Sequence, residues 1–253
     1  MTTPLNILWL YPDLLNLHGD RGNAMALTRV CDQAGVAARV TRVDRLHDAV
    51  PLRDADLLMA GSGELAVMPS IVAALTPVRA VLEQMVDDGA PMLVTGTSAA
   101  ILARQTIRTD GTTFAGLGLL AMDVAERAKI YGDDLIVQDG EEYCGFQIRM
   151  TNLNLDDSQA PFARVVYGLG NDQNHNDVEG ARRGNLIATG LLGPVLVKNP
   201  WLAWQLIGVA LRCKGIEAAS PDETAWARER QSAAATRQFN ATKQLPLGVV
   251  HDV

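Results

Sequence analysis

The expected fold is decided by the stretch Asp88-Gly-Ala-Pro-Met-Leu-Val-Thr-Gly-Thr-Ser-Ala-Ala-Ile-Leu-Ala103. Its apolar run Pro91–Thr95 is typical of a buried strand, and Gly96-Thr-Ser98 turns the chain into a helical pattern at Ala99–Arg104. A strand that ends in a small-residue turn before a helix is where α/β enzymes mount a nucleophile, because the sharp turn lifts one side chain above the sheet. The stretch therefore predicts an α/β protein with an elbow at Gly96.

Short apolar runs alternate with helical patterns on both sides of this elbow, which is typical of a parallel α/β sheet. The predicted strands are Ile7–Tyr11, Val36–Arg42, Leu57–Ala60 and Leu186–Leu192. The predicted helices are Asn23–Gln33, a long one at about residues 70–87, and Pro200–Lys214.

The middle of the chain has a different character. Four shorter strand-like runs precede the polar segment Gly168–Arg183, which we expect to be a loop; the runs are Ala128–Tyr131, Leu135–Val137, Cys144–Arg149 and Ala163–Tyr167. Antiparallel strands beside or extending the parallel sheet would account for them. We expect residues 1–253 to form one domain, with a polar helical tail from about residue 220 to 253 and a charged helix at Glu223–Gln231.

Composition excludes several classes of protein. The 253 residues carry 22 Lys and Arg against 29 Asp and Glu, a net charge of −7, which argues against generic nucleic-acid binding. The apolar stretches fall short of the ~20 residues of a membrane span, and the N-terminus lacks the basic region of a signal peptide. These observations predict a cytoplasmic protein with no membrane span.

The cysteines and acidic residues suggest neither a disulfide framework nor a metal site. The three cysteines, Cys31, Cys144 and Cys213, are far apart, lack C-x-x-C spacing, and are expected to pack as small hydrophobic residues. Asp172 and His175 lie in a polar run without the regular ligand ladder of a calcium loop. We therefore expect no metal and no cofactor.

Several motifs resemble one known family. Leu10-Tyr-Pro-Asp-Leu-Leu-Asn-Leu-His-Gly-Asp-Arg-Gly-Asn23 resembles the opening motif of the GatD family, and Leu191-Leu-Gly-Pro-Val-Leu-Val-Lys-Asn-Pro200 resembles its closing motif. GatD is the glutamine amidotransferase subunit of lipid II isoglutaminyl synthase, related to cobyric acid synthase-type amidotransferases. Shorter motifs between the two fall in the family's order, namely Gly116-Leu-Gly-Leu-Leu120, Tyr167-Gly-Leu-Gly-Asn171 and Glu179-Gly180.

The resemblance spans about residues 5–231 and implies a flavodoxin-like class I glutamine amidotransferase fold. Such a fold has a mostly parallel sheet with helices on both faces, here with an antiparallel extension. The family's chemistry uses an elbow cysteine that attacks the glutamine side-chain amide, a histidine that activates it, and backbone N–H groups of a glycine-rich loop that hold the oxyanion. The ammonia passes to MurT, a Mur-ligase-like partner that uses ATP to amidate the D-glutamate of the lipid II stem peptide.

The catalytic positions of the family are substituted in this chain. Aligning the elbow motif Pro-x-Leu-x-x-Cys-Gly-Gly with Pro91–Ser98 puts Gly96 in place of the cysteine. Aligning Gly-Thr-Tyr-Leu-His-Gly-Pro with Ala188–Pro194 puts Leu192 in place of the histidine. Glycine has no nucleophile and leucine accepts no proton, so the alignment predicts that glutaminase activity is lost.

The glutamine pocket of the family is also altered. The Gly-Gly-Gly loop corresponds to Ala60-Gly61-Ser62 followed by Gly63, and an arginine of the glutamine pocket corresponds to Lys129. We expect Gly61, Ser62, Gly63 and Lys129 to be the remnant of the glutamine pocket. Gly145-Phe-Gln-Ile-Arg149 replaces the family's Gly-Phe-Glu-Asn-His.

Three functions remain open from the sequence. The resemblance favours a non-catalytic or regulatory GatD-like subunit of a MurT-like ligase. A hydrolase or transferase could instead use Ser98 or Thr97, although these residues also serve as helix caps and no histidine is evidently placed as their base. Alternatively, the vacated glutamine pocket could bind a different small ligand.

Overall fold

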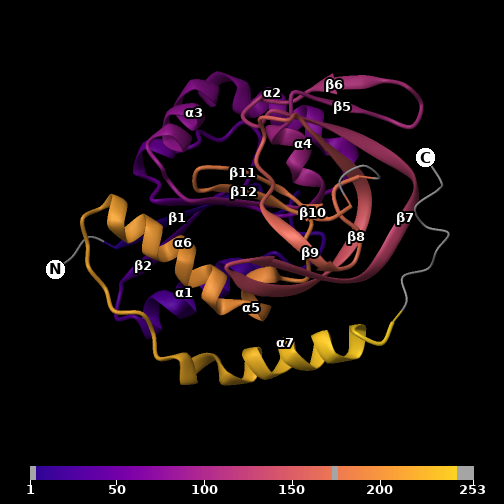
Figure 1. The fold of residues 1–253 in the computed structure, drawn as a ribbon. Coiled ribbons are helices and arrows are strands. Elements are labelled where there is room, and N and C mark those ends of the chain that lie inside the picture. Colours follow the sequence, from indigo (N-terminus) through magenta and orange to yellow (C-terminus); the bar gives the residue numbers. More distant parts are fainter. Residues whose placement is uncertain (1–3, 173–175, 244–253) are drawn as a thin grey trace.

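The core of the fold is a six-stranded sheet in which five neighbouring strands run parallel (Figure 1). The computed structural model describes residues 4–172 and 176–243. The strand order is β11-β12-β4-β3-β1-β2, and only the edge strand β11 is antiparallel to its neighbour. The strands are β1 (Leu5–Leu10), β2 (Ala38–Val43), β3 (Leu57–Ala60), β4 (Met92–Thr95), β11 (Ala181–Arg183) and β12 (Leu186–Thr189).

Helices cover both faces of this sheet, as predicted. Leu8 and Leu10 of β1 pack into one core, and Ile7 and Trp9 pack into the other. Because both faces are buried, the strands are continuously apolar rather than alternating. The first face carries α2 (Met68–Leu75), α3 (Arg79–Asp87) and α4 (Ala99–Leu102), and the second carries α1 (Arg21–Gln33), α5 (Val195–Lys198) and α6 (Pro200–Cys213).

The middle of the chain forms a second six-stranded sheet, which is mostly antiparallel. Its order is β10-β9-β7-β5-β6, and β8 pairs with β7 along the other edge of that strand. The strands are β5 (Gln105–Ile107), β6 (Thr113–Ala115), β7 (Met122–Asp139), β8 (Glu141–Leu155), β9 (Ala163–Tyr167) and β10 (Val178–Glu179). The antiparallel character was predicted, and of the two predicted arrangements the strands form a sheet beside the parallel one rather than an extension of it.

Two predictions for this region were wrong in detail. The predicted short strands at residues 128–131, 135–137 and 144–149 belong to one long hairpin of β7 and β8, with a register shift between Glu126 and Tyr131. The predicted loop Gly168–Arg183 contains β10 and β11. The alternation is broken because residues 128–130 are exposed in a row at the register shift, whereas residues 135–137 and 143–145 are buried in a row.

A short bridge joins the two sheets. Leu192 and Phe146 form an antiparallel bridge, with Leu192 N donating to Phe146 O at 2.8 Å. Nearby, the Asn199 side chain accepts from Cys144 N at 2.8 Å and donates to Cys144 O at 2.8 Å. These contacts fix the segment after β12 against β8 and hold Leu192 in place.

The helical segment Leu65–Asp87 corrects the expectation about apolar stretches. It has 23 residues and a mean hydropathy of 1.8, so it is long and apolar enough to cross a membrane by length and composition. In the fold it is interrupted by a 3-10 turn, Thr76–Val78, because Pro77 cannot continue the preceding helix. Ile71, Leu75 and Leu82 are buried in the core on the parallel sheet.

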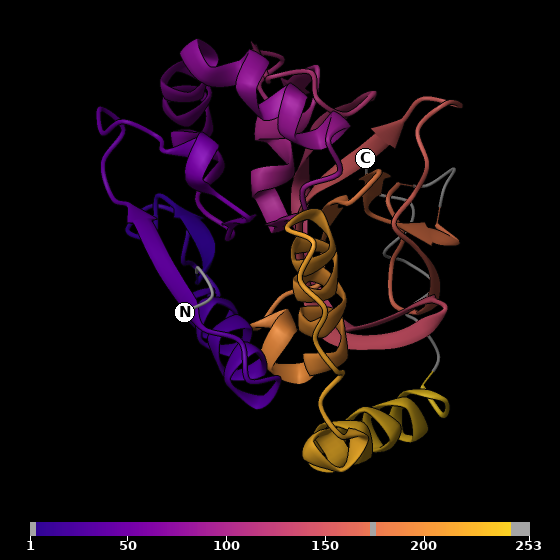
Figure 2. The same cartoon turned by 90° about the vertical axis from the view of Figure 1, so that its left-hand side faces the viewer.

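The C-terminal part of the described chain folds across the hairpin of the second sheet (Figure 2). A 3-10 turn (Glu223–Trp226) leads into α7 (Ala227–Asn240), which is longer than the predicted helix at 223–231. Arg230 pairs with Glu141 at 2.8 Å, and Arg237 pairs with Glu142. The remaining 3-10 turns are Leu52–Asp54, Leu65–Val67 and Gly96–Ser98.

Candidate functional site

The elbow is present, but it carries no side chain. β4 ends at Thr95, Gly96 has a φ of +59°, and a 3-10 turn over Gly96–Ser98 enters α4. Glycine adopts a positive φ without the steric cost that other residues meet. The turn that positions a nucleophile in other α/β enzymes is therefore retained on a residue that cannot supply one.

The structure brings together three positions that the sequence singled out. A Cβ placed on Gly96 would lie 2.8 Å from Ser62 Cβ and 3.1 Å from Leu192 Cδ2, and it would also meet Ser62 Oγ. Carbon atoms that are not bonded to each other overlap at 2.8 Å, so a side chain at position 96 would require Ser62 to move. Ser62 and Leu192 thus fill the space above the elbow.

The loop after β3 has its backbone donors bonded within the protein. Ser62 N donates to Asp20 Oδ2 at 3.1 Å, and Gly63 N donates to Thr97 Oγ1 at 3.3 Å. The Thr97 hydroxyl in turn donates to Gly63 O, and Ser62 Oγ lies 3.2 Å from Thr97 Oγ1. An oxyanion hole needs N–H groups that point at the reacting oxygen. These two N–H groups point at side chains instead.

The Asp20 carboxylate holds the same loop in place through hydrogen bonds. It is buried and accepts hydrogen bonds from Thr95 Oγ1 at 3.0 Å and from Asn23 Nδ2 at 3.1 Å, besides that from Ser62 N. Burial raises the pKa of Asp20, and these hydrogen bonds oppose the increase. The sequence analysis did not single out Asp20; its place in the opening motif was the available signal.

Ser98 and Thr97 do not have the surroundings of a nucleophile. Ser98 is 0% exposed and its hydroxyl donates to Gly61 O at 2.5 Å. Neither residue caps α4 with its side chain, contrary to the alternative drawn from the sequence. Within residues 4–172 and 176–243, neither hydroxyl bonds to a histidine. His18 packs edge-on against Phe146, with ring centroids 6.2 Å apart, and His175 lies outside the described residues.

A small cavity lies beside Gly96, near the place where the sequence predicts a glutamine pocket. Its volume is about 30 Å³, which is room for about one water molecule. Lys129 is exposed, on the irregular part of β7, and does not line this cavity. The lining residues are Gly96, Thr97, Ile148, Arg149, Met150, Thr151, Leu153, Glu179 and Gly190.

Two charged residues in the cavity wall were missed by the sequence analysis. Arg149 donates from Nη2 to Leu169 O at 2.8 Å and from Nε to Gln147 Oε1 at 3.1 Å, and burial lowers its pKa to about 10. Glu179 accepts from Gly190 N at 2.5 Å and from Thr189 Oγ1 at 2.8 Å, and burial raises its pKa. Both groups are bonded mainly to neighbouring protein atoms, as buried charges require.

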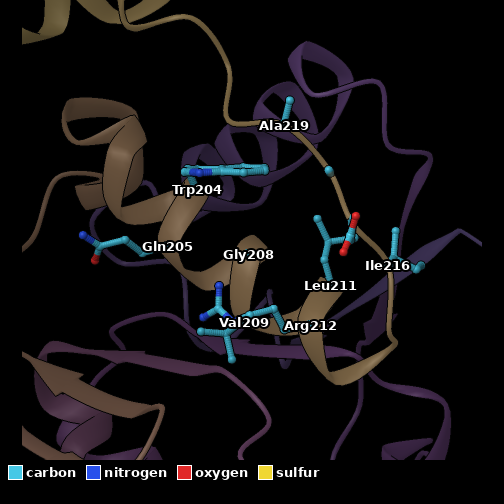
Figure 3. A pocket seen from close by; sticks show the side chains of 10 residues that line it. Trp204, Gln205, Gly208, Val209, Leu211, Arg212, Ile216 and Ala219 are labelled. Atoms are coloured by element: carbon cyan, nitrogen blue, oxygen red, sulfur yellow. The ribbon is translucent and has the colours of Figure 1, made fainter.

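A larger hollow lies away from the elbow, between α6 and the segment that follows it (Figure 3). Its volume is about 810 Å³, and Trp204, Gly208 and Arg212 of α6 line one side. None of the predicted site residues lines it. Among the residues that the structure describes, no group of three or more histidine, cysteine, aspartate or glutamate side chains is arranged to hold a metal ion.

The two buried thiols do not have the surroundings of a nucleophile. Cys31 and Cys144 are buried, and burial raises their pKa values to about 12 and about 11. Cys213 is exposed, so the prediction that all three cysteines are packed was wrong for this one. It lies at the end of α6, where the helix meets solvent.

Comparison with known proteins confirms the resemblance. Residues 6–200 match the CobB/CobQ-like glutamine amidotransferase domain. The chain is 30% identical over 220 residues to the lipid II isoglutaminyl synthase (glutamine-hydrolyzing) subunit GatD of Streptococcus pneumoniae (strain ATCC BAA-255 / R6), covering 83% of this chain and 82% of that protein. It is 25% identical over 214 residues to the corresponding subunit of Staphylococcus aureus (strain N315), covering 84% of this chain and 86% of that protein.

Solved structures share the same fold. A glutamine amidotransferase crystal structure aligns with a TM-score of 0.54 at 18% identity, covering 80% of this chain and 98% of that one. The PurLQS structure from Thermotoga maritima aligns with a TM-score of 0.51 at 17% identity, covering 76% and 87%. The chain belongs to the CobB/CobQ-like glutamine amidotransferase family.

Proposed function

We propose that this chain is a GatD-like subunit in the amidation of the peptidoglycan precursor lipid II, and that it has lost glutaminase activity. The first part of this proposal is supported by the two relatives, which are GatD subunits of lipid II isoglutaminyl synthase and align over most of this chain. The second part is supported by the substituted catalytic positions, Gly96 and Leu192.

One observation carries the loss of activity. Ser62 and Leu192 fill the space in which the elbow nucleophile would stand, and a Cβ on Gly96 would lie 2.8 Å from Ser62 Cβ. In this proposal the site therefore lacks the nucleophile and the base, and Ser62 crowds the space in which a nucleophile at position 96 would stand. A cavity of about 30 Å³ also leaves no space for an amino acid, which argues against a small ligand in the former pocket. In this proposal Gly61, Ser62 and Gly63, in the loop beside the elbow, are the remnant of that pocket, whereas Lys129 does not line the cavity.

The proposed role is to bind, stabilise or regulate a MurT-like Mur ligase in the cytoplasm. The relatives are named as subunits of a synthase, so a partner chain is expected. With no glutaminase in this chain, the ligase would take ammonia from solution or from another subunit. Hydrolysis by Ser98 or Thr97 is not favoured by any contact around those hydroxyls.

The test is a glutaminase assay on the purified chain together with a Mur-ligase-like protein from the same organism. We expect no release of glutamate from glutamine, and amidation of the lipid II substrate when ammonium is supplied. The Streptococcus pneumoniae relative with its own ligase is the positive control for glutamate release. Glutamate release by this chain would overturn the loss of activity, and failure of the ligase to associate with it would overturn the partnership.

A further inference from the structure

α1 and α5 lie on the face of the parallel sheet opposite α3 (Figure 1). An apolar cavity is lined by residues of α1, α5 and the start of the C-terminal helical segment. Its volume is about 280 Å³. The side chains that form its apolar part are those of Met25, Ala26, Val30, Leu196, Val197, Pro200 and Trp226. We name this cavity together with its flanking residues Arg21, Arg29 and Lys198 the α1–α5 patch.

Two apolar side chains at the mouth of the cavity are exposed. Met25 is 62% exposed and Val197 is 46% exposed, whereas Trp226 beneath them is only 4% exposed. Single exposed apolar residues are ordinary on protein surfaces. Two of them lining one apolar cavity are typical of an interaction site.

The α1–α5 patch is held rigidly. Leu196 N donates to Asn23 Oδ1 at 2.9 Å, and Trp226 Nε1 donates to Gln33 Oε1 at 3.3 Å. Gly22 allows α1 and α5 to approach so closely that a Cβ there would lie 3.0 Å from Pro194 Cβ. Because the helices are fixed in this way, the surface needs little ordering on binding, which favours affinity.

Arg21 and Arg29 place positive charge on α1 beside the cavity, although the chain carries a net charge of −7. Arg21, Met25 and Arg29 follow one another at four-residue spacing, so they share one face of α1. Lys198 is exposed next to Val197 on α5, but its Nζ lies over the Phe146 ring of β8, 5.6 Å from the ring centroid, and it does not line the cavity. The acid in the cavity wall is Glu229, 4.0 Å from Arg29. The complementary surface is an apolar side chain with carboxylates beside it.

The patch is also built from the segments that carry the family resemblance. α1 begins inside the opening motif at Arg21, and α5 lies inside the closing motif Leu191–Pro200. Met25, Arg29 and Val30 of the patch follow directly after the opening motif, which ends at Asn23.

We infer that the α1–α5 patch is the surface that receives the ligase subunit, through an apolar side chain with acidic neighbours that enters between Met25 and Val197. This inference rests on the proposed function, because it takes the partner from there. It adds the location of the contact and the chemistry of the segment that makes it.

The test measures the dissociation constant between the full-length chain and the Mur-ligase-like protein. Met25→Glu and Val197→Glu are each expected to weaken binding at least about ten-fold, as for residues at the centre of an interface. Ile130→Glu is the matched control: Ile130 is 63% exposed, lies on β7, and its change should alter binding less than about two-fold. Arg21→Glu with Arg29→Glu should slow association and reduce its salt dependence.

The outcomes separate the inference from the proposed function. If the wild-type chain binds the ligase and Met25→Glu binds equally well, the inference is overturned while the proposed function stands. If the wild-type chain does not bind the ligase, both are overturned. The chain could also bind vesicles of phosphatidylglycerol and cardiolipin, or associate with itself. If Met25→Glu abolishes either of these and keeps ligase binding, the patch belongs to a membrane or to a second copy, and the inference is overturned. Thermal unfolding of each variant confirms that it is folded.

Discussion

Ser62 occupies the space into which a side chain at Gly96 would project, with only 2.8 Å between Ser62 Cβ and a Cβ placed on Gly96. The two positions are 34 residues apart in the chain but adjacent in the fold, because parallel strands β3 and β4 end at the same edge of the sheet. A serine in the loop and a glycine on the elbow are therefore compatible with each other, whereas a serine and a larger elbow residue are not.

Gly96→Ala should destabilise the protein more than Gly35→Ala. Both glycines have a positive φ, but a Cβ on Gly35 would meet nothing within 4 Å. The positive φ alone costs about 1–3 kcal/mol, and crowding against Ser62 should add about 1 kcal/mol or more at Gly96. Urea unfolding of both variants measures the difference. Adding Ser62→Gly should recover part of the loss in Gly96→Ala, and a double-mutant cycle without such coupling would contradict the steric explanation.

Gly96→Cys with Leu192→His should not restore glutaminase activity. The new thiol would still compete with Ser62 for space, and the N–H groups of Ser62 and Gly63 would still be bonded to Asp20 and Thr97. Since oxyanion-hole donors contribute about 10²–10³ in rate each, their loss keeps a restored dyad inactive. Glutamate release measures the activity, with circular dichroism as the control for folding. Turnover in this double variant would show that the loop is not blocked.

Asp20→Ala should destabilise the protein by at least about 2 kcal/mol, because three buried donors lose their acceptor at about 1–3 kcal/mol each, and release of the buried charge offsets only part of this. Asp13→Ala is the control, since the Asp13 side chain is 74% exposed and lies 3.4 Å from Arg42. Its change should cost less than about 0.5 kcal/mol. Chemical unfolding at neutral pH compares the two. Equal losses would mean that the hydrogen bonds to Asp20 contribute little.

Glu179→Gln should change how stability depends on pH. Burial raises the folded-state pKa of Glu179 above the unfolded value of about 4.3. The stability from this group is therefore fully present below the unfolded pKa and is lost as pH rises through the folded pKa. The free energy of unfolding of the wild type, relative to Glu179→Gln, should increase as the pH falls from 7.5 to 5. Exposed Glu217→Gln is the surface control, and a pH-independent difference for Glu179→Gln would refute the shift.

One thiol of the three should react with a disulfide reagent in the native protein. Cys213 is exposed, whereas Cys31 and Cys144 are buried with pKa values raised to about 12 and about 11, so little thiolate forms there. Titration with the reagent should give one equivalent natively and three in denaturant. Cys213→Ser should abolish the native reaction, and persistent reaction in that variant would show that a buried thiol is accessible.

Elements with a strong local pattern were predicted closely. The strand Leu57–Ala60 has the predicted bounds, and the predicted helix Pro200–Lys214 ends one residue early at Cys213. A continuous apolar run marks a strand buried on both faces, and the Asn199-Pro200 start and Gly215 stop are local signals for a helix. The second sheet was harder to predict, since runs of three exposed residues (128–130) and three buried residues (135–137 and 143–145) break the alternation of β7 and β8. That residues 1–253 form a single domain stays a prediction.

By itself the sequence determined the fold class and the elbow at Gly96, and it predicted the substitution of both catalytic positions. Each of these follows from residues that are neighbours in the chain or from motifs of a few residues. Only the tertiary structure decided that Ser98 bonds to Gly61 rather than capping its own helix, that Arg149 and not Lys129 lines the cavity, and that Ser62 lies against Gly96. The physical reason is that these contacts join residues tens of positions apart, where packing and burial decide between partners that local rules treat as equivalent.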